Sequence, residues 1–348
     1  MKKVKLGFIG CGYMGQLAHI ANYATMQDVE LTALADMREK TAAEVAKRYG
    51  IHSVYRDHRE LLDKADVDAV VAIMGYDQHH NVVPDILNAG KNCLTEKPIC
   101  IKVSTAQKLQ QLAEKKGIVY HIGYMKRCDL ASKLMKEKIA EWKKSNECGA
   151  LKYLRVSMPP GDWTHQIENA INLGDKPAGT IPAGESLPDK MSKEEQQRYN
   201  GFINYYIHQV NLIRYLLGED YTVEFVDARE VLMVCKSKSG ITIALEMNAY
   251  EVRDEWHEYY KACFDKGFIS MSLPAPMARQ RSGDLIIYRN TKSGGAYEHP
   301  VLPPVWCMRE QAHIFIEEVQ GKISCISPAA DAVKDLEIAE AFIAKSKK

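Results

Sequence analysis

Excess charge of either sign is missing from this sequence, and so are long apolar runs. The 348 residues carry 46 basic and 45 acidic side chains, so the formal net charge is +1. Nucleic-acid binding usually rests on a basic surplus, which this chain does not have. No apolar run approaches the ~20 residues of a membrane-spanning helix, and the apolar stretch after Lys3 is too short for the core of a secretory leader. These absences predict a cytoplasmic protein that binds neither nucleic acids nor membranes.

Closely spaced cysteine pairs are missing too. The nine cysteines are an odd number, and no two of them form a C-x-x-C pair. Zinc sites and disulfide frameworks commonly show such regular spacings, so the sequence predicts neither, and no metal is expected. Thiols in a chain without an export signal fit a reducing compartment.

The first fifteen residues are the most informative part of the chain. Val4–Ile9 is apolar like a buried strand, and it runs into Gly10–Gly15, which reads G-x-G-x-x-G. An amphipathic stretch from Gln16 to Ala24 follows. A strand, this glycine pattern and a helix, in that order, are the fingerprint of a dinucleotide-binding turn. The glycines allow a tight turn, close approach of a pyrophosphate and close packing of the helix on the strand, and the helix N-terminus attracts the pyrophosphate.

A second apolar strand, Glu30–Ala35, ends in Asp36. An acidic residue about 20 residues beyond the glycines bonds the ribose hydroxyls of NAD in such folds. Because a carboxylate repels a 2′-phosphate, Asp36 favours NAD over NADP, and Arg38 is the residue that could soften this preference. The cofactor-binding residues predicted in this region are Gly10, Cys11, Gly12, Tyr13, Met14, Gly15, Asp36, Met37 and Arg38.

Strands and helices alternate through the first third of the chain. After the residues already described, apolar runs and helical patterns predict strands at 68–73, 92–95 and 119–123 and helices at 39–49, 58–65, 82–89 and 104–116. Gly50 and Gly117 stand where helix C-caps are expected, and Ser104 stands where an N-cap is expected. This rhythm predicts a doubly wound parallel sheet, and we expect residues 1–123 to form an NAD-binding Rossmann domain.

The pattern changes after residue 123. Strand-like runs separated by turn residues predict a large, mostly antiparallel open sheet, with strands at 151–158, 222–228, 230–236, 241–249, 259–264, 268–273 and 284–289 and helices at 202–217, 307–320 and 329–344. We therefore expect an α/β domain followed by an α+β domain for substrate binding and oligomerisation over 124–348, whose last helix packs back on the first domain. An open sheet with an apolar outer face has to be buried somewhere, so a homo-oligomer, either a dimer or a tetramer, is predicted.

Glu96-Lys97-Pro98 follows the predicted strand 92–95. Ligands of doubly wound sheets bind beyond the carboxyl ends of the strands, so we expect Lys97 to face the cofactor. A lysine beside a cationic nicotinamide ring can relay a proton to or from a substrate hydroxyl. The motif is short, and a surface lysine on a loop has the same local sequence.

Together these motifs resemble the Gfo/Idh/MocA family, the oxidoreductases named after glucose–fructose oxidoreductase and inositol dehydrogenase. The resemblance covers essentially the whole chain. Its elements, in the family's order and spacing, are the glycine motif, Asp36, Gly90-Lys91, Glu96-Lys97-Pro98, the G-x-x-x-R stretch Gly123–Arg127 and the histidine-bearing helix Ile207–Asn211 that leads to Leu216–Gly218.

The resemblance implies roles for individual residues. Lys97 would be the catalytic lysine bonded to the reacting hydroxyl, and His208 the general acid/base that moves its proton while hydride passes to the nicotinamide. Many members carry Asp one helical turn before this histidine, whereas this chain has Asn204, which can bond a sugar hydroxyl but cannot stabilise an imidazolium by charge. Further residues implied for the cofactor are Met74, His79, Glu96 and Lys97, and those implied for the substrate are Lys97, Tyr124, Arg127, Asn204 and His208.

Two of these roles have simpler alternatives when the resemblance is set aside. His208 then fits a structural histidine on an apolar helix. Arg127 fits an ion pair that supports the fold as well as it fits a substrate ligand.

The polar segment 159–200 is the expected substrate determinant. A run of this length without predicted structure is usually functional or disordered. It contains Trp163 and His165, and an aromatic ring beside polar groups suits a sugar. A loop that packs against a neighbouring subunit is the alternative.

We therefore expect an NAD-dependent dehydrogenase that oxidises a secondary hydroxyl of a sugar or glycoside, with C3 of a glycoside as a specific case. The size of 159–200 favours a glycoside over free inositol. The alternatives are an inositol 2-dehydrogenase, an enzyme that keeps its cofactor bound through alternate oxidation and reduction, and a non-catalytic NAD-binding protein.

Overall fold

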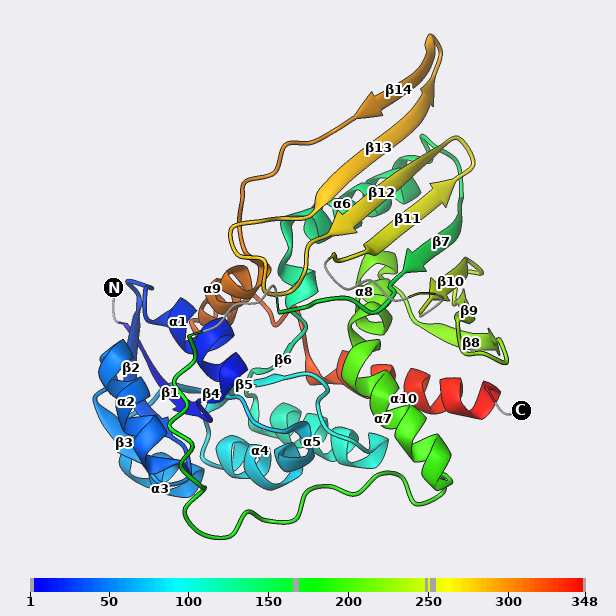
Figure 1. Cartoon of the computed structure of the whole chain (residues 1–348). Helices are drawn as coiled ribbons and strands as arrows, with labels where there is room; N and C mark the ends of the chain where they lie inside the picture. Colours follow the sequence, from blue (N-terminus) through cyan, green and yellow to red (C-terminus); the bar gives the residue numbers. More distant parts are fainter. Residues whose placement is uncertain (1–2, 165–168, 248–249, 251–254, 347–348) are drawn as a thin grey trace. The chain divides into compact units, whose positions relative to one another are not determined.

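The computed structural model describes residues 3–164, 169–247, 250 and 255–346, and the chain divides into two compact units (Figure 1). Each unit is assembled from three stretches of sequence. Unit 1 comprises Met1–Tyr124, Glu168–Gln196 and Met308–Leu336, and unit 2 comprises Met125–Ile167, Gln197–Cys307 and Glu337–Lys348. The expected boundary after residue 123 lies beside the first of these changes, but it assumed that each domain is continuous in sequence.

Unit 1 contains a six-stranded sheet in which all neighbours run parallel. The order is β3-β2-β1-β4-β5-β6, with strands β1 (Val4–Ile9), β2 (Val29–Ala35), β3 (Ser53–Tyr55), β4 (Ala69–Ala72), β5 (Asn92–Glu96) and β6 (Tyr120–Gly123). From β1 the chain adds strands outwards to β3 on one side, and then returns to the centre to add β4, β5 and β6 on the other side. The strand order therefore reverses between β1 and β4. Ligands of such sheets bind at this switch point, beyond the carboxyl ends of the strands. The predicted doubly wound sheet is therefore confirmed.

Helices surround this sheet, and most of them begin and end near the predicted residues. They are η1 (Gly15–Ile20), α1 (Ala21–Tyr23), α2 (Glu39–Tyr49), α3 (His58–Lys64), η2 (Tyr76–Gln78), α4 (His79–Asn88), α5 (Val103–Lys116) and α9 (Cys307–Val319). Gly50 and Gly117 adopt the left-handed conformation of helix C-caps, as predicted. The N-cap prediction for Ser104 is wrong, because α5 starts one residue earlier and its N-cap, Lys102, makes no side-chain capping bond.

Unit 2 contains an eight-stranded sheet, which confirms the predicted large and mostly antiparallel sheet. Its order is β14-β13-β12-β11-β7-β10-β9-β8, with strands β7 (Leu151–Ser157), β8 (Tyr221–Val226), β9 (Leu232–Ser237), β10 (Thr242–Glu246), β11 (Glu258–Phe264), β12 (Gly267–Leu273), β13 (Asp284–Thr291) and β14 (Gly294–Glu298). β7 and β10 pair in parallel, and the other pairs are antiparallel.

Helix α6 (Leu130–Ser145) packs against β12 and β13 on one face of the unit 2 sheet. The remaining elements are η3 (Met125–Cys128), α6 (Leu130–Ser145), α7 (Lys193–Tyr205), α8 (Ile207–Leu217) and α10 (Ala329–Lys345). Trp142 of α6 meets Phe264 of β11 edge to face, with ring centroids 5.0 Å apart. Side chains alternate between the two faces along a strand. Tyr259, five residues before Phe264 on β11, therefore points to the other face, away from α6, and it is half-exposed.

The helix expected at 202–217 is two helices, and the first starts inside the segment that was expected to lack structure. α7 begins at Lys193, directly after Ser192. Ser192 Oγ accepts from the Glu195 backbone N–H at 3.2 Å, and Glu195 Oε2 accepts from the Ser192 N–H at 2.8 Å. This reciprocal capping box satisfies two donors that a helix start leaves unbonded.

Among the described residues, no helix is both long enough and apolar enough to cross a membrane.

Candidate active site

The glycine motif forms a tight turn at the end of β1. Gly10 has φ of 85°, and a Cβ there would lie 2.0 Å from the Ile73 carbonyl oxygen. A Cβ on Gly15 would lie 2.6 Å from the Gly10 carbonyl oxygen, whereas one on Gly12 would meet no atom within 4 Å. The first and third glycines are therefore required by packing inside the protein. The second faces open space, which is where a pyrophosphate approaches the backbone in dinucleotide-binding turns.

Asp36 lies at the end of β2 beside this turn, as predicted. Its Oδ2 accepts from the Cys11 backbone N–H at 2.8 Å, which ties the carboxylate to the glycine turn. Arg38 donates to both carboxylate oxygens, from Nε at 3.0 Å and from Nη2 at 2.8 Å. Burial alone raises the pKa of Asp36, but the bonds from Arg38 and Cys11 outweigh it and hold the pKa below its usual value. The carboxylate is therefore ionised and fixed in place.

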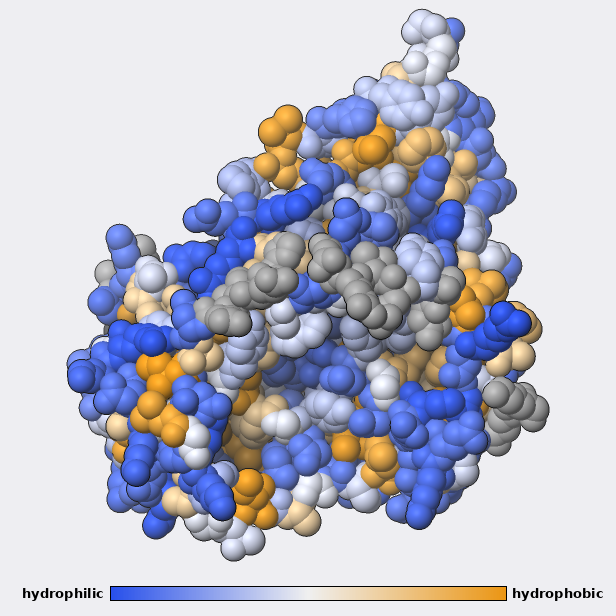
Figure 2. Space-filling view, viewed as in Figure 1, coloured by the Kyte–Doolittle hydropathy of each residue, from blue (hydrophilic) through white to orange (hydrophobic). Residues whose placement is uncertain are grey.

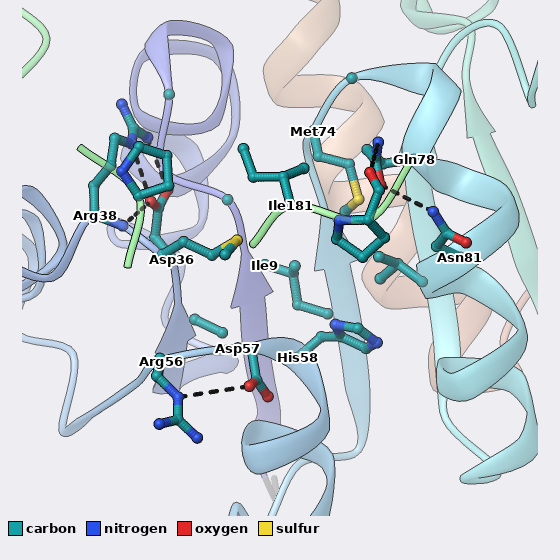
Figure 3. Close-up of a pocket in the computed structure, with 18 of the residues that line it drawn as sticks. Ile9, Asp36, Arg38, Arg56, Asp57, His58, Met74, Gln78, Asn81 and Ile181 are labelled. Carbon is teal, nitrogen blue, oxygen red and sulfur yellow. Dashed lines mark hydrogen bonds and ion pairs between the residues drawn. The ribbon is translucent and has the colours of Figure 1, made fainter. Parts of the chain in front are cut away.

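A cavity of about 550 Å³ opens beside Asp36 (Figure 3). Asp36 and Arg38 lie on one side of it, and Met74, Gln78 and Asn81 lie on the other. Its volume is within the usual range for a small-molecule pocket. Six predicted cofactor residues line it, namely Gly10, Gly12, Asp36, Met37, Arg38 and Met74. Seven do not line it: Cys11, Tyr13, Met14, Gly15, His79, Glu96 and Lys97.

A further part of the cavity lining comes from far along the chain. Pro177, Thr180, Ile181 and Pro182 line it, and they belong to the segment that was expected to determine the substrate. We call residues 169–186 the strap. The strap has no helix or strand, yet it forms part of compact unit 1. Sequence reasoning missed this role because polar composition does not say which surface a loop will follow.

The first half of the strap is bonded to η1 and α2. Gln16 makes a two-way bond with the backbone of Ile171, donating to its oxygen at 2.9 Å and accepting from its N–H at 2.7 Å. Asp175 accepts from the backbone N–H groups of Lys40 and Thr41 at 2.9 and 3.3 Å, and from the Thr41 hydroxyl at 2.5 Å. The bond from the Thr41 hydroxyl is the main reason that the pKa of Asp175 is lowered. Asp175 thus caps α2 from 134 residues away.

The second half of the strap is bonded first beside Asp36 and then to the opposite side of the cavity. The Ala178 N–H donates to the Met37 oxygen at 2.7 Å, directly after Asp36. Asn81 Nδ2 then donates to the Ala183 oxygen at 3.0 Å, and Glu185 Oε2 accepts from the Ile101 N–H at 2.8 Å. The strap therefore runs from α2 past the end of β2 to the residues after β5. Leu173 and Ile181 of the strap are more than half exposed, and Figure 2 shows hydrophobic patches scattered among hydrophilic side chains on the face in view.

Lys97 follows β5 directly, as predicted, and the bond between Lys97 and Pro98 is cis. The preceding Glu96 is held by His19 of η1, with His19 Nε2 and Glu96 Oε1 2.8 Å apart. Burial would raise the pKa of Glu96, but the bond from His19 and the charges of His19 and Lys97 outweigh this and lower it. Glu96 is therefore ionised, directly before Lys97 in the chain. His19 was missed by the sequence analysis, because one histidine on the buried face of a helix gives no signal by itself.

His79 is fully buried at the start of α4, and one of its nitrogens has no bonding partner. Nδ1 lies 2.9 Å from the Ile99 carbonyl oxygen, to which it can only donate, while Nε2 is buried without a partner in the protein. Burial lowers the pKa of His79 to about 4. At neutral pH the ring is therefore uncharged and its Nε2 is a hydrogen-bond acceptor. A ribose hydroxyl is a suitable donor for such an atom, so His79 fits a bound dinucleotide.

In unit 2, His208 is the second residue of α8 and is half-buried, whereas Asn204 lies on α7 and is exposed. Arg127 is 2% exposed, its Nε donates to Asn211 Oδ1 at 2.5 Å, and its guanidinium lies over the Tyr215 ring. This arrangement gives Arg127 a structural role in joining η3 to α8. Its role in substrate binding stays a prediction.

A buried carboxylate beside α8 was not foreseen from the sequence. Glu258 is 1% exposed and accepts from Lys126 Nζ, with which it forms an ion pair. It also accepts from Gln209, the neighbour of His208, at 2.8 Å, from Tyr260 at 2.9 Å and from Trp256 at 3.1 Å. Four donors therefore surround this one carboxylate and connect η3, α8 and β11. No sequence motif joins these positions, since the network exists only after folding.

The other predicted substrate residues have varied settings. Tyr124 is buried at the end of unit 1. Trp163 is 38% exposed, and its carbonyl oxygen accepts from the Met277 N–H at 3.3 Å. His165 lies outside the described residues. Of these, Trp163 alone combines a described position with an accessible aromatic ring.

Comparison with known proteins confirms the resemblance for the first part of the chain. Residues 4–124 match the Gfo/Idh/MocA family, described as an oxidoreductase family with an NAD-binding Rossmann fold. Residues 4–124 are therefore similar to the NAD-binding Rossmann domain of this oxidoreductase family.

Sequence similarity to individual proteins covers more of the chain than this domain. A myo-inositol 2-dehydrogenase of Thermotoga maritima is 24% identical over 229 residues, which cover 64% of this chain and 58% of that protein. Two solved structures share the fold over nearly the whole chain. One is a putative NADPH-dependent oxidoreductase from Desulfitobacterium hafniense, with a TM-score of 0.78 and 15% identity over 99% of this chain and 95% of that one.

The second structure is scyllo-inositol dehydrogenase from Lactobacillus casei with bound NAD(H) and scyllo-inositol. Its TM-score is 0.67, with 17% identity over 98% of this chain and 96% of that one. At these identities the structures show the fold alone. One of them uses NADPH by its name and the other holds NAD(H), so the comparisons leave the choice of nicotinamide cofactor open.

Proposed function

We propose that this chain is an NAD-dependent dehydrogenase that oxidises a secondary hydroxyl of a cyclic polyol or sugar. The observation that carries the proposal is the cofactor geometry of unit 1. The glycine turn faces open space at Gly12, the ionised Asp36 lies beside the cavity, and His79 Nε2 is a buried acceptor without a partner. Each of these suits one part of a dinucleotide, namely a pyrophosphate, an adenosine ribose and a second ribose.

Bound NAD would supply the hydride acceptor, and the chain's own side chains would handle the proton. Lys97, which follows the ionised Glu96, donates a hydrogen bond to the substrate oxygen and stabilises negative charge on it. His208 accepts the hydroxyl proton as general base, a role that suits an imidazole near neutral pH. In the reverse reduction the same groups return the proton.

The length of the 159–200 segment no longer argues for a large substrate, because its central part is the strap, which lines the nucleotide cavity. Trp163 remains the reason to propose a sugar ring, since its accessible indole can stack on the C–H face of a pyranose. C3 oxidation of a glycoside is the specific case that we propose. The inositol dehydrogenases among the relatives favour free inositols as the second candidate.

The test is NADH formation with a substrate panel under identical conditions: myo-inositol, scyllo-inositol, glucose, galactose and methyl and aryl α- and β-glucosides. Faster turnover with glycosides than with inositols would support the specific case. Turnover with inositols alone would support the second candidate. No reduction of NAD or NADP with any member, together with no binding of either dinucleotide, would contradict the proposal.

Asp36 and Arg38 should control the choice of cofactor. We expect Asp36→Ala to raise KM for NAD by about tenfold or more, because a charge-assisted bond to the ribose is lost, and to leave KM for NADP unchanged or lower. Arg38→Ala should impair NADP more than NAD. The measurement is kcat/KM with both cofactors, with the exposed Asp63→Asn as control. A wild-type protein that prefers NADP would contradict the predicted preference.

The strap should slow cofactor release. Asp175→Ala removes the cap on α2 and loosens the first half of the strap, so we expect the dissociation rate of NADH to rise by about three- to tenfold, which is what one lost capping interaction corresponds to. Thr41→Val should act in the same direction and by less. Stopped-flow displacement of NADH, followed by its fluorescence, measures the rate. Lys176→Ala, an exposed change on the strap, serves as control, and equal rates in all variants would show that the strap does not hold the cofactor.

We also propose a homodimer formed through the uncovered face of the unit 2 sheet. Tyr259, Ile286 and Tyr297 are 48%, 36% and 64% exposed there, and open apolar sheet faces are usually buried by a partner. Sedimentation velocity at micromolar concentration should show a dimer or a tetramer. Ile286→Asp should shift it to the monomer, while Val54→Asp in unit 1 should not. A wild-type monomer would contradict this proposal.

A further inference from the structure

A group of three side chains with metal-binding chemistry lies in unit 1, and none of the three lines the nucleotide cavity. His121 comes from β6, Glu318 from α9 and Cys325 from the connection between α9 and α10. One ligand atom from each, a ring nitrogen, a carboxylate oxygen and the sulfur, all lie within 4.8 Å of one another. The sequence predicted no metal site, because these residues are separated by up to about two hundred positions and form no spacing motif.

The backbone around this group is fixed by bonds that do not involve the ligand atoms. The Ile122 N–H donates to the Ser327 oxygen at 2.9 Å, and Ser327 Oγ donates to the Ile122 oxygen at 2.7 Å. These two bonds attach the α9–α10 connection to the edge strand β6, one residue beyond His121 and two residues beyond Cys325. The Ile326 N–H donates to Glu318 Oε1 at 2.8 Å, which leaves Oε2 for another partner. The three elements are therefore held together before any ligand binds, which lowers the cost of binding one.

The burial of this group favours binding of a cation. The side chains of His121 and Glu318 are both fully buried, with Nδ1 and Oε2 2.8 Å apart. The other ring nitrogen of His121, Nε2, is buried with no hydrogen-bond partner. A carboxylate out of water is stabilised by positive charge nearby. A divalent cation bound by Glu318 and a Cys325 thiolate would be neutralised by two anionic ligands.

We propose that His121, Glu318 and Cys325 bind a divalent transition-metal ion of the zinc type. The donor set of nitrogen, oxygen and sulfur is the one that zinc accepts, whereas magnesium and calcium take oxygen ligands. Three protein ligands leave one tetrahedral position for water or another small ligand. Cys325 lines a surface hollow of about 260 Å³, together with Glu114 and Tyr120, which gives an ion access to the site.

Binding is an exchange of protons for the metal ion. The Cys325 thiol releases its proton to solvent, any proton held between His121 and Glu318 is released as well, and the ion forms bonds to the three ligand atoms. No oxidant or reductant is needed. Affinity therefore rises with pH, because protons and metal compete for the same atoms. The bound ion would tie the edge strand β6 to α9 and to the connection that leads to α10.

Cobalt(II) is the probe of choice because its spectrum reports both geometry and sulfur ligation. The full-length protein is treated with chelator, freed of nucleotide and titrated with Co²⁺. We expect visible bands of tetrahedral cobalt and a near-ultraviolet thiolate-to-cobalt band that saturate at one ion per chain, and Zn²⁺ should abolish both. Cys325→Ser should remove the thiolate band and weaken binding by about tenfold or more. The matched control is Cys263→Ser, at another partly buried cysteine, and it should bind as the wild type does.

Thermal unfolding with and without Zn²⁺ is an independent readout, because an ion that binds only the folded chain raises the melting temperature. The rise should be present in the wild type and Cys263→Ser and absent in Cys325→Ser. This second readout also keeps the test valid if His121→Gln or Glu318→Gln fails to fold. A wild type without a thiolate band, or a band that persists in Cys325→Ser, would show that the group is only a buried ion pair beside a thiol. Neither measurement involves the proposed dehydrogenase activity, so the two proposals fail separately.

Discussion

Replacing Lys97 by alanine is expected to lower kcat/KM for polyol oxidation by about 10²- to 10⁴-fold, the usual contribution of a positioned proton-transfer group. The physical reason lies in its setting: Lys97 follows β5 at the carboxyl edge of the sheet, directly after Glu96, which is held by His19 at 2.8 Å. Cofactor affinity should change little, because Lys97 does not line the nucleotide cavity. Steady-state kinetics together with NADH-binding titration separate the two effects.

Lys116→Ala is the matched control for this prediction, because it removes an exposed lysine from the same unit. Lys97→Arg keeps the charge but changes the position of the donors, and it should recover little activity. His208→Asn should also reduce kcat/KM strongly, and it should remove the loss of rate that a histidine base causes at acidic pH. A Lys97→Ala variant with wild-type turnover would exclude Lys97 from catalysis and would favour the non-catalytic alternative.

Glu258→Gln is expected to destabilise the protein by about 3–5 kcal/mol, the cost of breaking a buried ion pair by removing one partner. Glu258 is 1% exposed, and its loss leaves the buried ammonium of Lys126 without a counter-charge. The bonds from Gln209, Tyr260 and Trp256 would also lose their anionic acceptor. Urea denaturation followed by tryptophan fluorescence measures the free energy of unfolding.

A second ion pair of the same sheet provides the comparison. Arg155 and Glu246 are 3.4 Å apart on the exposed surface of β7 and β10, so Glu246→Gln should cost less than about 1 kcal/mol. In the double variant Lys126→Met/Glu258→Gln most of the loss should be recovered, since no buried charge remains unpaired. Equal costs at Glu258 and Glu246 would mean that burial does not control the strength of the Glu258 pair.

The structure also changes how one segment of the chain is understood. The sequence analysis assigned 159–200 to substrate recognition because of its length and polarity. Its strap instead forms hydrogen bonds with η1, α2, α4 and the residues after β5, and it lines the nucleotide cavity. Because the strap is bonded on both sides of this cavity, we expect the protein to release its dinucleotide slowly. Substrate size then has to be decided by the panel of polyols.

Local signals allowed much of unit 1 to be predicted. The apolar runs, the glycine spacing and the helix-ending glycines gave the β1 turn, the bounds of α2 and the positions of Asp36 and Lys97, because these features depend on a few neighbouring residues. β3 and β14 were missed. β3 has three residues, and β14 begins with two glycines, so neither carries a strong strand pattern. The start of α7 was also missed, although Ser192 and Glu195 have capping-box spacing.

The sequence by itself determined the class of the N-terminal fold, the dinucleotide turn and the lysine beside it. Only the tertiary structure decided what surrounds them. Glu96 bonds to His19 across 77 residues, and Asp175 caps α2 across 134 residues. Glu258 accepts from four donors up to 132 residues away, and His121 lies beside Glu318 across 197 residues. Turns and helix ends follow from short-range sterics and hydrogen bonds, which the sequence displays. Buried polar partners are selected by which surfaces pack together, and that follows only from the fold as a whole.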